Sequence, residues 1–154
     1  FAEVLDEYPD AELYICGDGR LREDLNSQVT ELGIAEAVTF LRHVQYDEMP
    51  KVYRSGDVLV LPSRAEGMPR TVLEAMASGL WIVMNDLDQF TSVLGEQGHV
   101  VSDDGYTSFA DGLIRSIEKS NKTSIRVVSD EYRWTDTVKR TTQVLQSLAK
   151  KAHE

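Results

Sequence analysis

Residues 57–84 read DVLVLPSRAEGMPRTVLEAMASGLWIVM, and this stretch decides the fold. It contains two short apolar runs, 58–61 and 80–84, separated by a segment with helical patterning. Short apolar runs bounded by turn signals are typical of strands that are buried on both faces. Pro69 suits the first position of the intervening helix, and Gly79 suits its end. The stretch therefore predicts a strand–helix–strand unit of a parallel sheet.

The rest of the chain alternates between the same two kinds of pattern. Further strands are predicted over residues 11–17, 37–41 and 98–102, and helices over 1–8, 20–33, 46–56, 88–94, 106–120 and 130–154. In the helix 20–33, apolar residues recur at helical spacing at Leu21, Leu25, Val29 and Leu32. This alternation predicts one α/β domain over residues 1–154, a Rossmann-like parallel sheet of five strands with helices on both faces. Ligands of such sheets bind at the carboxyl ends of the strands, so we expect a site in the loops that follow Cys16, Leu41, Leu61 and Met84.

Composition argues against a nucleic-acid partner and bears on the compartment. The chain has 154 residues, of which 42% are hydrophobic and 27% charged, with a formal net charge of -10. A binder of nucleic acid would show a basic face, so no nucleic-acid partner is expected. The single cysteine, Cys16, cannot form an internal disulfide, which favours a reducing compartment and a cytoplasmic location. We expect Cys16 to be a packed small side chain, and Arg20 and Arg22 to be solvated.

The segment before the predicted helix has the features of an anion site. Gly67 allows the backbone to turn closely under a ligand. Pro69 has no backbone N–H, but at the first position of a helix that donor would have no partner within the helix. The amides of Met68, Arg70 and Thr71 are left free at the positive end of a helix. This arrangement suits a diphosphate.

Two carboxylates flank that helix start. Glu66 precedes it in the loop, and Glu74 lies within its first turns. Carboxylates accept hydrogen bonds from neighbouring hydroxyls, as on a ribose or another sugar. A simpler reading stays open, in which Glu74 pairs with Arg70 four residues earlier, a contact of about 0.3–0.5 kcal/mol, and Glu66 is a solvated loop residue.

Three motifs carry a resemblance to a known family. The block PSRAEGMPRTVLEAMASG (62–79) resembles the E-x7-E block of GT-B glycosyltransferases, especially family GT4, in their C-terminal nucleotide-sugar-binding half. The segment YICGDGRLREDL (14–25) resembles their Gly-x-Gly strand-to-helix segment, and YDEMPKVYRSGDVLVLPS (46–63) resembles the helix and strand before the glutamates. The resemblance implies a donor-binding domain, one GT-B half, with the first strand and an N-terminal acceptor domain missing ahead of Phe1.

The resemblance also implies a role for each matching residue. Glu66 is the implied catalytic residue, in contact with hydroxyls of the transferred sugar, and Glu74 binds the ribose hydroxyls. The other implied contacts are Gly67, Met68, Pro69 and Arg70 under the diphosphate and sugar, Thr71 and Val72 near the phosphate or ribose, Arg42, His43 and Val44 beside the nucleobase, and Gly17 and Gly19 along the floor of the cleft.

The implied activity is retaining transfer of a hexose from a UDP- or GDP-linked sugar, with the nucleotide-diphospho-sugar as substrate and no cofactor or metal. The acceptor, a glycan, a lipid or a small molecule, is bound by the missing domain, through which membrane association is an option. The isolated fragment is expected to be inactive. Arg42 stands in place of a usual Gly, Trp81 in place of a frequent Pro, and NDLDQF (85–90) in place of a Gly-Gly turn followed by Pro. Two alternatives therefore stay open: an epimerase-like relative that acts on nucleotide-sugars, and a non-catalytic nucleotide-binding module on the same half-fold.

Overall fold

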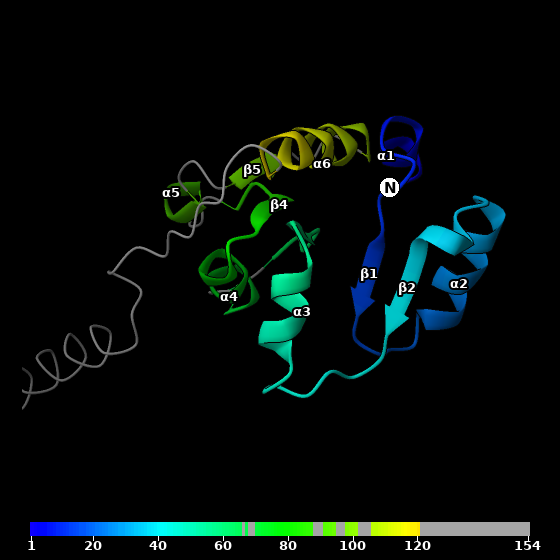
Figure 1. Cartoon of the computed structure of the whole chain (residues 1–154), viewed down its shortest axis with the longest axis horizontal. Helices are drawn as coiled ribbons and strands as arrows, with labels where there is room; N and C mark the ends of the chain where they lie inside the picture. Colours follow the sequence, from blue (N-terminus) through cyan, green and yellow to red (C-terminus); the bar gives the residue numbers. More distant parts are fainter. Residues whose placement is uncertain (66, 68–69, 88–90, 95–97, 102–105, 121–154) are drawn as a thin grey trace, which may run out of the picture.

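The predicted order of strands and helices is present in the computed structural model, which describes residues 1–65, 67, 70–87, 91–94, 98–101 and 106–120 (Figure 1). The elements are α1 (Ala2–Glu7), β1 (Leu13–Cys16), α2 (Arg22–Glu31), a short 3-10 turn η1 (Ala35–Ala37), β2 (Val38–Leu41), α3 (Met49–Ser55), β3 (Val58–Leu61), α4 (Arg70–Ser78), β4 (Trp81–Asn85), α5 (Thr91–Leu94), β5 (Gly98–Val101) and α6 (Tyr106–Ser120). The α/β class is confirmed. The helix expected over 130–154 lies outside the described residues.

All pairings between the described strands are parallel, as predicted. β1 pairs with β2, and β4 lies between β3 and β5. The five strands thus form two hydrogen-bonded groups, of two and three strands, where the sequence predicted one continuous sheet. Among the described residues, β1 and β3 each have one strand neighbour, so each leaves one edge without a described partner strand.

Strand β4 is the centre of the larger group. Each of its five residues is buried, and Ile82, Val83 and Met84 are fully so. Ile82 and Met84 belong to the apolar cluster formed with α3 and α4, whereas Trp81 lies under Lys119 of α6, with 5.1 Å between the ammonium and the ring centroid. Alternate residues of β4 therefore contact helices on opposite faces of the sheet. This alternation is expected of a strand that has helices packed on both faces.

Helix α4 forms because its apolar residues share one face. Val72, Ala75 and Met76 are buried at helical spacing and pack in the cluster with β4. The helix ends at Gly79, whose φ of 91° is in the left-handed region that favours glycine. The Gly79 N–H donates to the Met76 carbonyl and the Leu80 N–H to the Ala75 carbonyl, so the last turn is capped as the sequence predicted.

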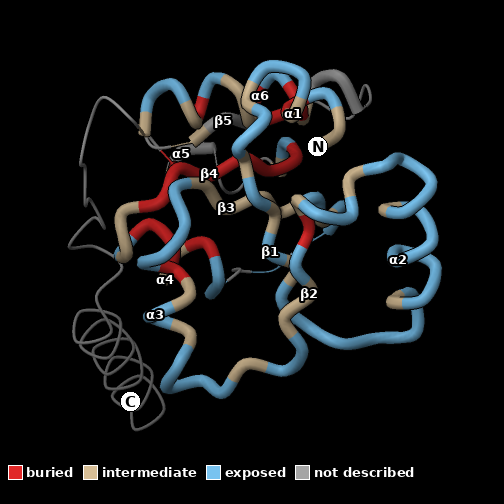
Figure 2. Tube along the Cα trace, turned by 45° about the vertical axis from the view of Figure 1, so that its right-hand side comes forward, coloured by how far each residue is buried: buried red, intermediate tan, exposed pale blue. Residues whose placement is uncertain are grey.

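One burial prediction is wrong, and one helix, α2, is more exposed than its neighbours. The residues of β3 are all half-buried rather than buried on both faces, because β4 is the single described strand beside it. No residue of α2 is buried, and Leu21 and Leu32 at its ends are 57% and 53% exposed. Figure 2 shows α2 in the exposed and intermediate colours, away from the buried segments around β4 and α4. The apolar residues of α2 that recur at helical spacing thus have no burial to match that spacing.

We predict that Ile82→Ala lowers the free energy of unfolding by about 2–5 kcal/mol, because it leaves a cavity at a fully buried position. The matched control is Leu32→Ala, which should change that free energy by less than about 0.5 kcal/mol at an exposed position. Urea unfolding followed by circular dichroism measures both. Equal losses in the two variants would contradict the assignment of β4 as the core strand.

Candidate functional site

The loops that follow β2, β3 and β4 meet at one edge of the fold. The side chain of Asn85, at the end of β4, is buried and donates from Nδ2 to the Ser63 carbonyl in the loop after β3, at 3.0 Å. Arg70, the first residue of α4, donates from Nη2 to the hydroxyl of Tyr46 in the loop after β2, at 3.1 Å. These two contacts bring together the loops at the carboxyl ends where the sequence predicts a site.

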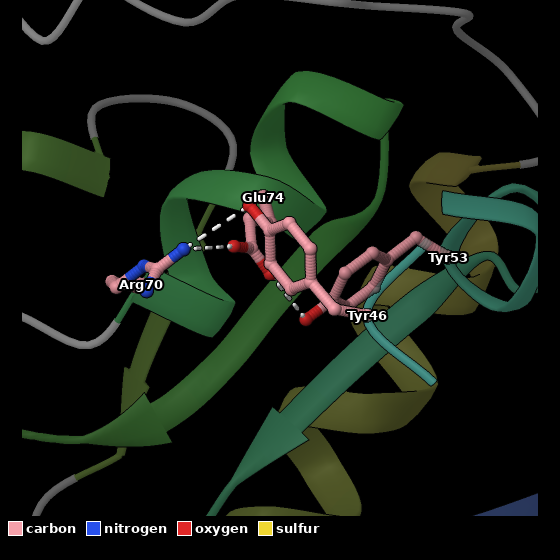
Figure 3. A network of polar contacts seen from close by, with 4 residues as sticks. All are labelled: Tyr46, Tyr53, Arg70 and Glu74. Carbon is pink, nitrogen blue, oxygen red and sulfur yellow. Dashed lines mark hydrogen bonds and ion pairs between the residues drawn. The ribbon is translucent and has the colours of Figure 1, made fainter. Parts of the chain in front are cut away.

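Glu74 and three other side chains, Tyr46, Tyr53 and Arg70, form a polar network at this edge (Figure 3). The phenol of Tyr53, on α3, donates to Glu74 Oε2 at 3.1 Å. The Arg70 Nη2 atom lies 3.6 Å from Glu74 Oε1 and also reaches Tyr46, whose ring centroid is 5.5 Å from the guanidinium carbon. Arg70 and Tyr53 approach Glu74 from opposite sides. The carboxylate is therefore contacted at both oxygens.

The electrostatics of the network determine which group donates. Burial, then the negative charge of Glu74 and the hydrogen bond to it, raise the pKa of the Tyr53 phenol, with smaller contributions from Cys16 and Tyr46. A phenol with a raised pKa keeps its proton at neutral pH, and an ionised carboxylate is an acceptor only. Tyr53 is therefore the donor and Glu74 the acceptor.

The pairing of Arg70 with Glu74 that the spacing allowed is present, and the reading of Glu74 as a ribose contact stays a prediction. The Arg70 side chain is 74% exposed and that of Glu74 31% exposed. An ion pair at this level of exposure contributes about 0–1 kcal/mol. The pair is compatible with a binding role, because an exposed arginine can exchange one anionic partner for another at little cost.

Several predicted site residues lie near this network, and others lie outside the described residues. Glu66, Met68 and Pro69 are outside, so the predictions for them stay predictions. Gly67 and Thr71 are exposed. Val72 is 1% exposed and packs in the core, so its side chain is not open to a ligand, which leaves its backbone alone as a possible contact.

The loop predicted to lie beside the nucleobase follows β2 directly. Arg42 and His43 are exposed in it and Val44 is half-buried. The same loop carries Tyr46, which is 71% exposed and touches Arg70. The structure thus places this loop next to the start of α4, while no described contact tests its role toward a base.

Gly17 and Gly19 line a hollow of about 230 Å³ at the carboxyl end of β1. Its walls are Ile15, Cys16, Gly17, Asp18, Gly19, Leu21, Arg22, Leu25 and Phe40. Arg22 is not solvated as predicted: its guanidinium lies 5.3 Å from the Phe40 ring centroid and its Nη1 lies 3.9 Å from Asp18 Oδ1. The aromatic face of Phe40 attracts the cation, a contact that spacing along α2 does not reveal.

Cys16 is exposed and does not pack as predicted. It lies at the rim of this hollow and close enough to Tyr53 to contribute to the raised pKa of that phenol. The hollow and the Glu74 network are therefore neighbours at the same edge of the fold.

Sequence reasoning missed Tyr53 and Tyr46. Tyr53 lies on the apolar face of α3, so its pattern indicates a core residue, and that is where most of the side chain packs. Its hydroxyl contacts a residue 21 positions away, on another helix, and no local pattern predicts such a contact. Tyr46 stands in a polar loop, where nothing distinguishes it from a solvated residue.

Two kinds of feature, a metal-binding cluster and a membrane-spanning helix, were sought in the described residues alone. Within it, no group of three or more His, Cys, Asp or Glu side chains could hold a metal ion. Within the same residues, no helix is both long and apolar enough to cross a membrane.

We predict that Glu74→Gln lowers the pKa of the Tyr53 phenol but leaves it above the ordinary value of 10.0, because burial is the larger cause of the shift. Ultraviolet titration, with Tyr53→Phe to identify the signal, measures this. As pH rises past 10.0, the unfolded chain loses the Tyr53 proton and the folded chain keeps it, so stability should fall there, and fall less in Tyr53→Phe. An unchanged titration in Glu74→Gln would contradict the contact.

Comparisons with known proteins agree on one family. The family profile described as Glycosyl transferases group 1 matches residues 1–119. The chain is 41% identical over 80 residues to sulfoquinovosyl transferase SQD2 of Arabidopsis thaliana, covering 52% of this chain and 15% of that protein. It is 36% identical over 123 residues to phosphatidyl-myo-inositol mannosyltransferase of Mycobacterium tuberculosis, covering 75% of this chain and 32% of that protein.

Solved structures share the fold. The sucrose-phosphate synthase of Thermosynechococcus elongatus superposes with a TM-score of 0.78 at 18% identity, over 96% of this chain and 41% of its own. HepE of Anabaena, in complex with UDP and glucose, superposes with a TM-score of 0.72 at 21% identity, over 96% of this chain and 44% of its own. The chain spans less than half the length of each of these proteins.

Proposed function

Because this chain belongs to the glycosyl transferases group 1 family, we propose that it is the donor-binding domain of a glycosyltransferase and binds a nucleotide-diphospho-sugar for transfer of a hexose. The observation that carries the proposal is the carboxylate of Glu74, held at the carboxyl edge of the sheet by Tyr53 and partly open to solvent. The likeness to HepE, which was solved with UDP and glucose, supports the same choice of ligand.

In the proposed complex, different residues at the carboxyl ends of the strands contact different parts of the donor. Glu74 accepts hydrogen bonds from the ribose hydroxyls, and Glu66 from hydroxyls of the sugar. The positive start of α4 and the exposed guanidinium of Arg70 face the diphosphate. UDP and GDP differ in the base alone, so these contacts suit either nucleotide.

The proposed transfer is retaining and needs no metal. Negative charge develops on the diphosphate as the bond to the sugar breaks, and fixed positive groups lower the energy of that state. In this proposal, Arg70 and the positive start of α4 supply such groups. In this proposal they take over the charge stabilisation that a bound cation provides in other transferases.

We further propose that the whole protein contains an acceptor-binding domain and one more strand ahead of Phe1. The edges of β1 and β3 that have no described partner strand support the additional strand. In a doubly wound sheet the first strand lies between the second and the fourth. A preceding strand would take that place between β1 and β3 and join the two groups into one sheet. Without the acceptor domain, the chain is expected to bind donor but not to transfer sugar.

We predict that Glu74→Gln weakens binding of UDP or GDP to this chain by about ten- to a hundredfold, the range for a lost hydrogen bond to a charged group. Titration calorimetry with each nucleotide measures this. Glu31→Gln, an equal change at an exposed position of α2, should leave the affinity unchanged. Absence of any nucleotide binding, or equal affinity in the two variants, would contradict the proposal.

A further inference from the structure

The Tyr53 phenol joins the core of the domain to its proposed ligand edge. Tyr53 is 5% exposed and belongs to the apolar cluster with Val72, Ala75 and Met76 of α4. Its hydroxyl leaves that cluster to donate to Glu74 Oε2 at 3.1 Å. A ring fixed by packing on all sides holds its hydroxyl at a fixed point, so the position of the carboxylate oxygen is fixed as well.

We infer that Tyr53 is a positioning residue for donor binding: it holds Glu74 by Oε2 and thereby presents Oε1 to the ribose hydroxyls. The inference rests on the proposed function, in which Glu74 contacts the ribose. Tyr53 itself touches no part of the ligand. Its effect is to remove the rotational freedom of a long side chain before the nucleotide arrives, which lowers the cost of binding.

Arg70 does not fulfil this role, although it is also a partner of Glu74. Its side chain is 74% exposed, and its Nη2 lies 3.6 Å from Glu74 Oε1, beyond the usual length of a hydrogen bond. It is shared with Tyr46, to which the same nitrogen donates at 3.1 Å. An exposed and shared cation can leave Glu74 Oε1 when a hydroxyl takes its place, whereas the packed phenol stays on Oε2.

The two oxygens of Glu74 thus have different surroundings. One accepts from a neutral donor that is anchored in the core, and the other faces a solvent-exposed cation. A diphosphate at the start of α4 would attract that cation and leave Oε1 to the ribose. If Tyr53 positions Glu74, then removing the Tyr53 hydroxyl should weaken the binding of ligands that have ribose hydroxyls and should not weaken the binding of ligands that lack them.

The experiment is a double-mutant cycle in which one change is made in the protein and the other in the ligand. Affinities for UDP and for 2′,3′-dideoxy-UDP, which lacks the ribose hydroxyls, are measured by calorimetry in the wild-type chain, in Tyr53→Phe and in Tyr14→Phe. Tyr53→Phe should weaken UDP binding by about tenfold and leave binding of the dideoxy compound unchanged within about twofold. Tyr14→Phe is the matched control, because it removes a phenol-to-carboxylate hydrogen bond, to Glu12 at 2.6 Å, from a tyrosine of β1 that is exposed. It should change neither affinity.

The possible outcomes separate the inference from the proposed function. If Tyr53→Phe weakens both ligands equally, Tyr53 acts through general stability and the inference is overturned. If the wild-type chain prefers UDP to the dideoxy compound and Tyr53→Phe keeps that preference, the inference is overturned while the proposed function stands. If the wild-type chain binds neither compound, the proposed function itself fails.

A second variant keeps the test valid should Tyr53→Phe not fold. Glu74→Asp leaves α3 and its packing intact but withdraws the carboxylate by one methylene from the phenol. We expect Glu74→Asp to lose most of the preference for UDP over the dideoxy compound. Full retention of that preference would show that contact with Tyr53 is not needed, and would overturn the inference.

Discussion

The packing of α4 against β4 is the constraint from which the other features of the site follow. Three buried residues of the helix fix its rotation about its axis, so the position of each remaining side chain is set. Glu74 comes directly before two of them, Ala75 and Met76, and therefore emerges at the boundary between core and solvent. Tyr53 packs in the same cluster from α3, and for this reason its hydroxyl meets the carboxylate.

Within the network around Glu74, the side chains become more exposed from Tyr53 through Glu74 to Arg70. The exposed fraction rises from 5% for Tyr53, through 31% for the Glu74 side chain, to 74% for the side chain of Arg70. A carboxylate in such a place has one partner that is held by packing and one that is free to move. This combination suits a group that must be oriented before a ligand arrives and must still release one oxygen to it.

Local patterns predicted the elements well and their surroundings less well. The helix over 70–78 could be predicted because apolar spacing and Gly79 are both local signals, and β4 because its apolar run is unbroken. The half-burial of β3 could not be predicted, because a strand's burial depends on which neighbours pair with it. The exposed face of α2 and the stacking of Arg22 on Phe40 are also tertiary outcomes.

The features of the candidate site likewise divide into those that the sequence could predict and those that depend on tertiary contacts. Glu74 could be singled out because its distance from the helix start is a property of the sequence, whereas its contact with Tyr53 joins two helices that are separated by β3. The pairing with Arg70 was foreseeable from a spacing of four residues, and it is present. Glu66 lies outside the described residues, so its role as a sugar contact stays a prediction.

The central claim is that Glu74 contacts the ribose of a bound nucleotide while Tyr53 holds its other oxygen. A crystal structure of the chain with UDP tests this most directly. The account predicts that Glu74 Oε1 lies within hydrogen-bonding distance, about 2.6–3.2 Å, of a ribose hydroxyl, with the Tyr53 contact to Oε2 unbroken. A nucleotide bound with its ribose hydroxyls away from Glu74, or with Glu74 still paired to Arg70 alone, would contradict it.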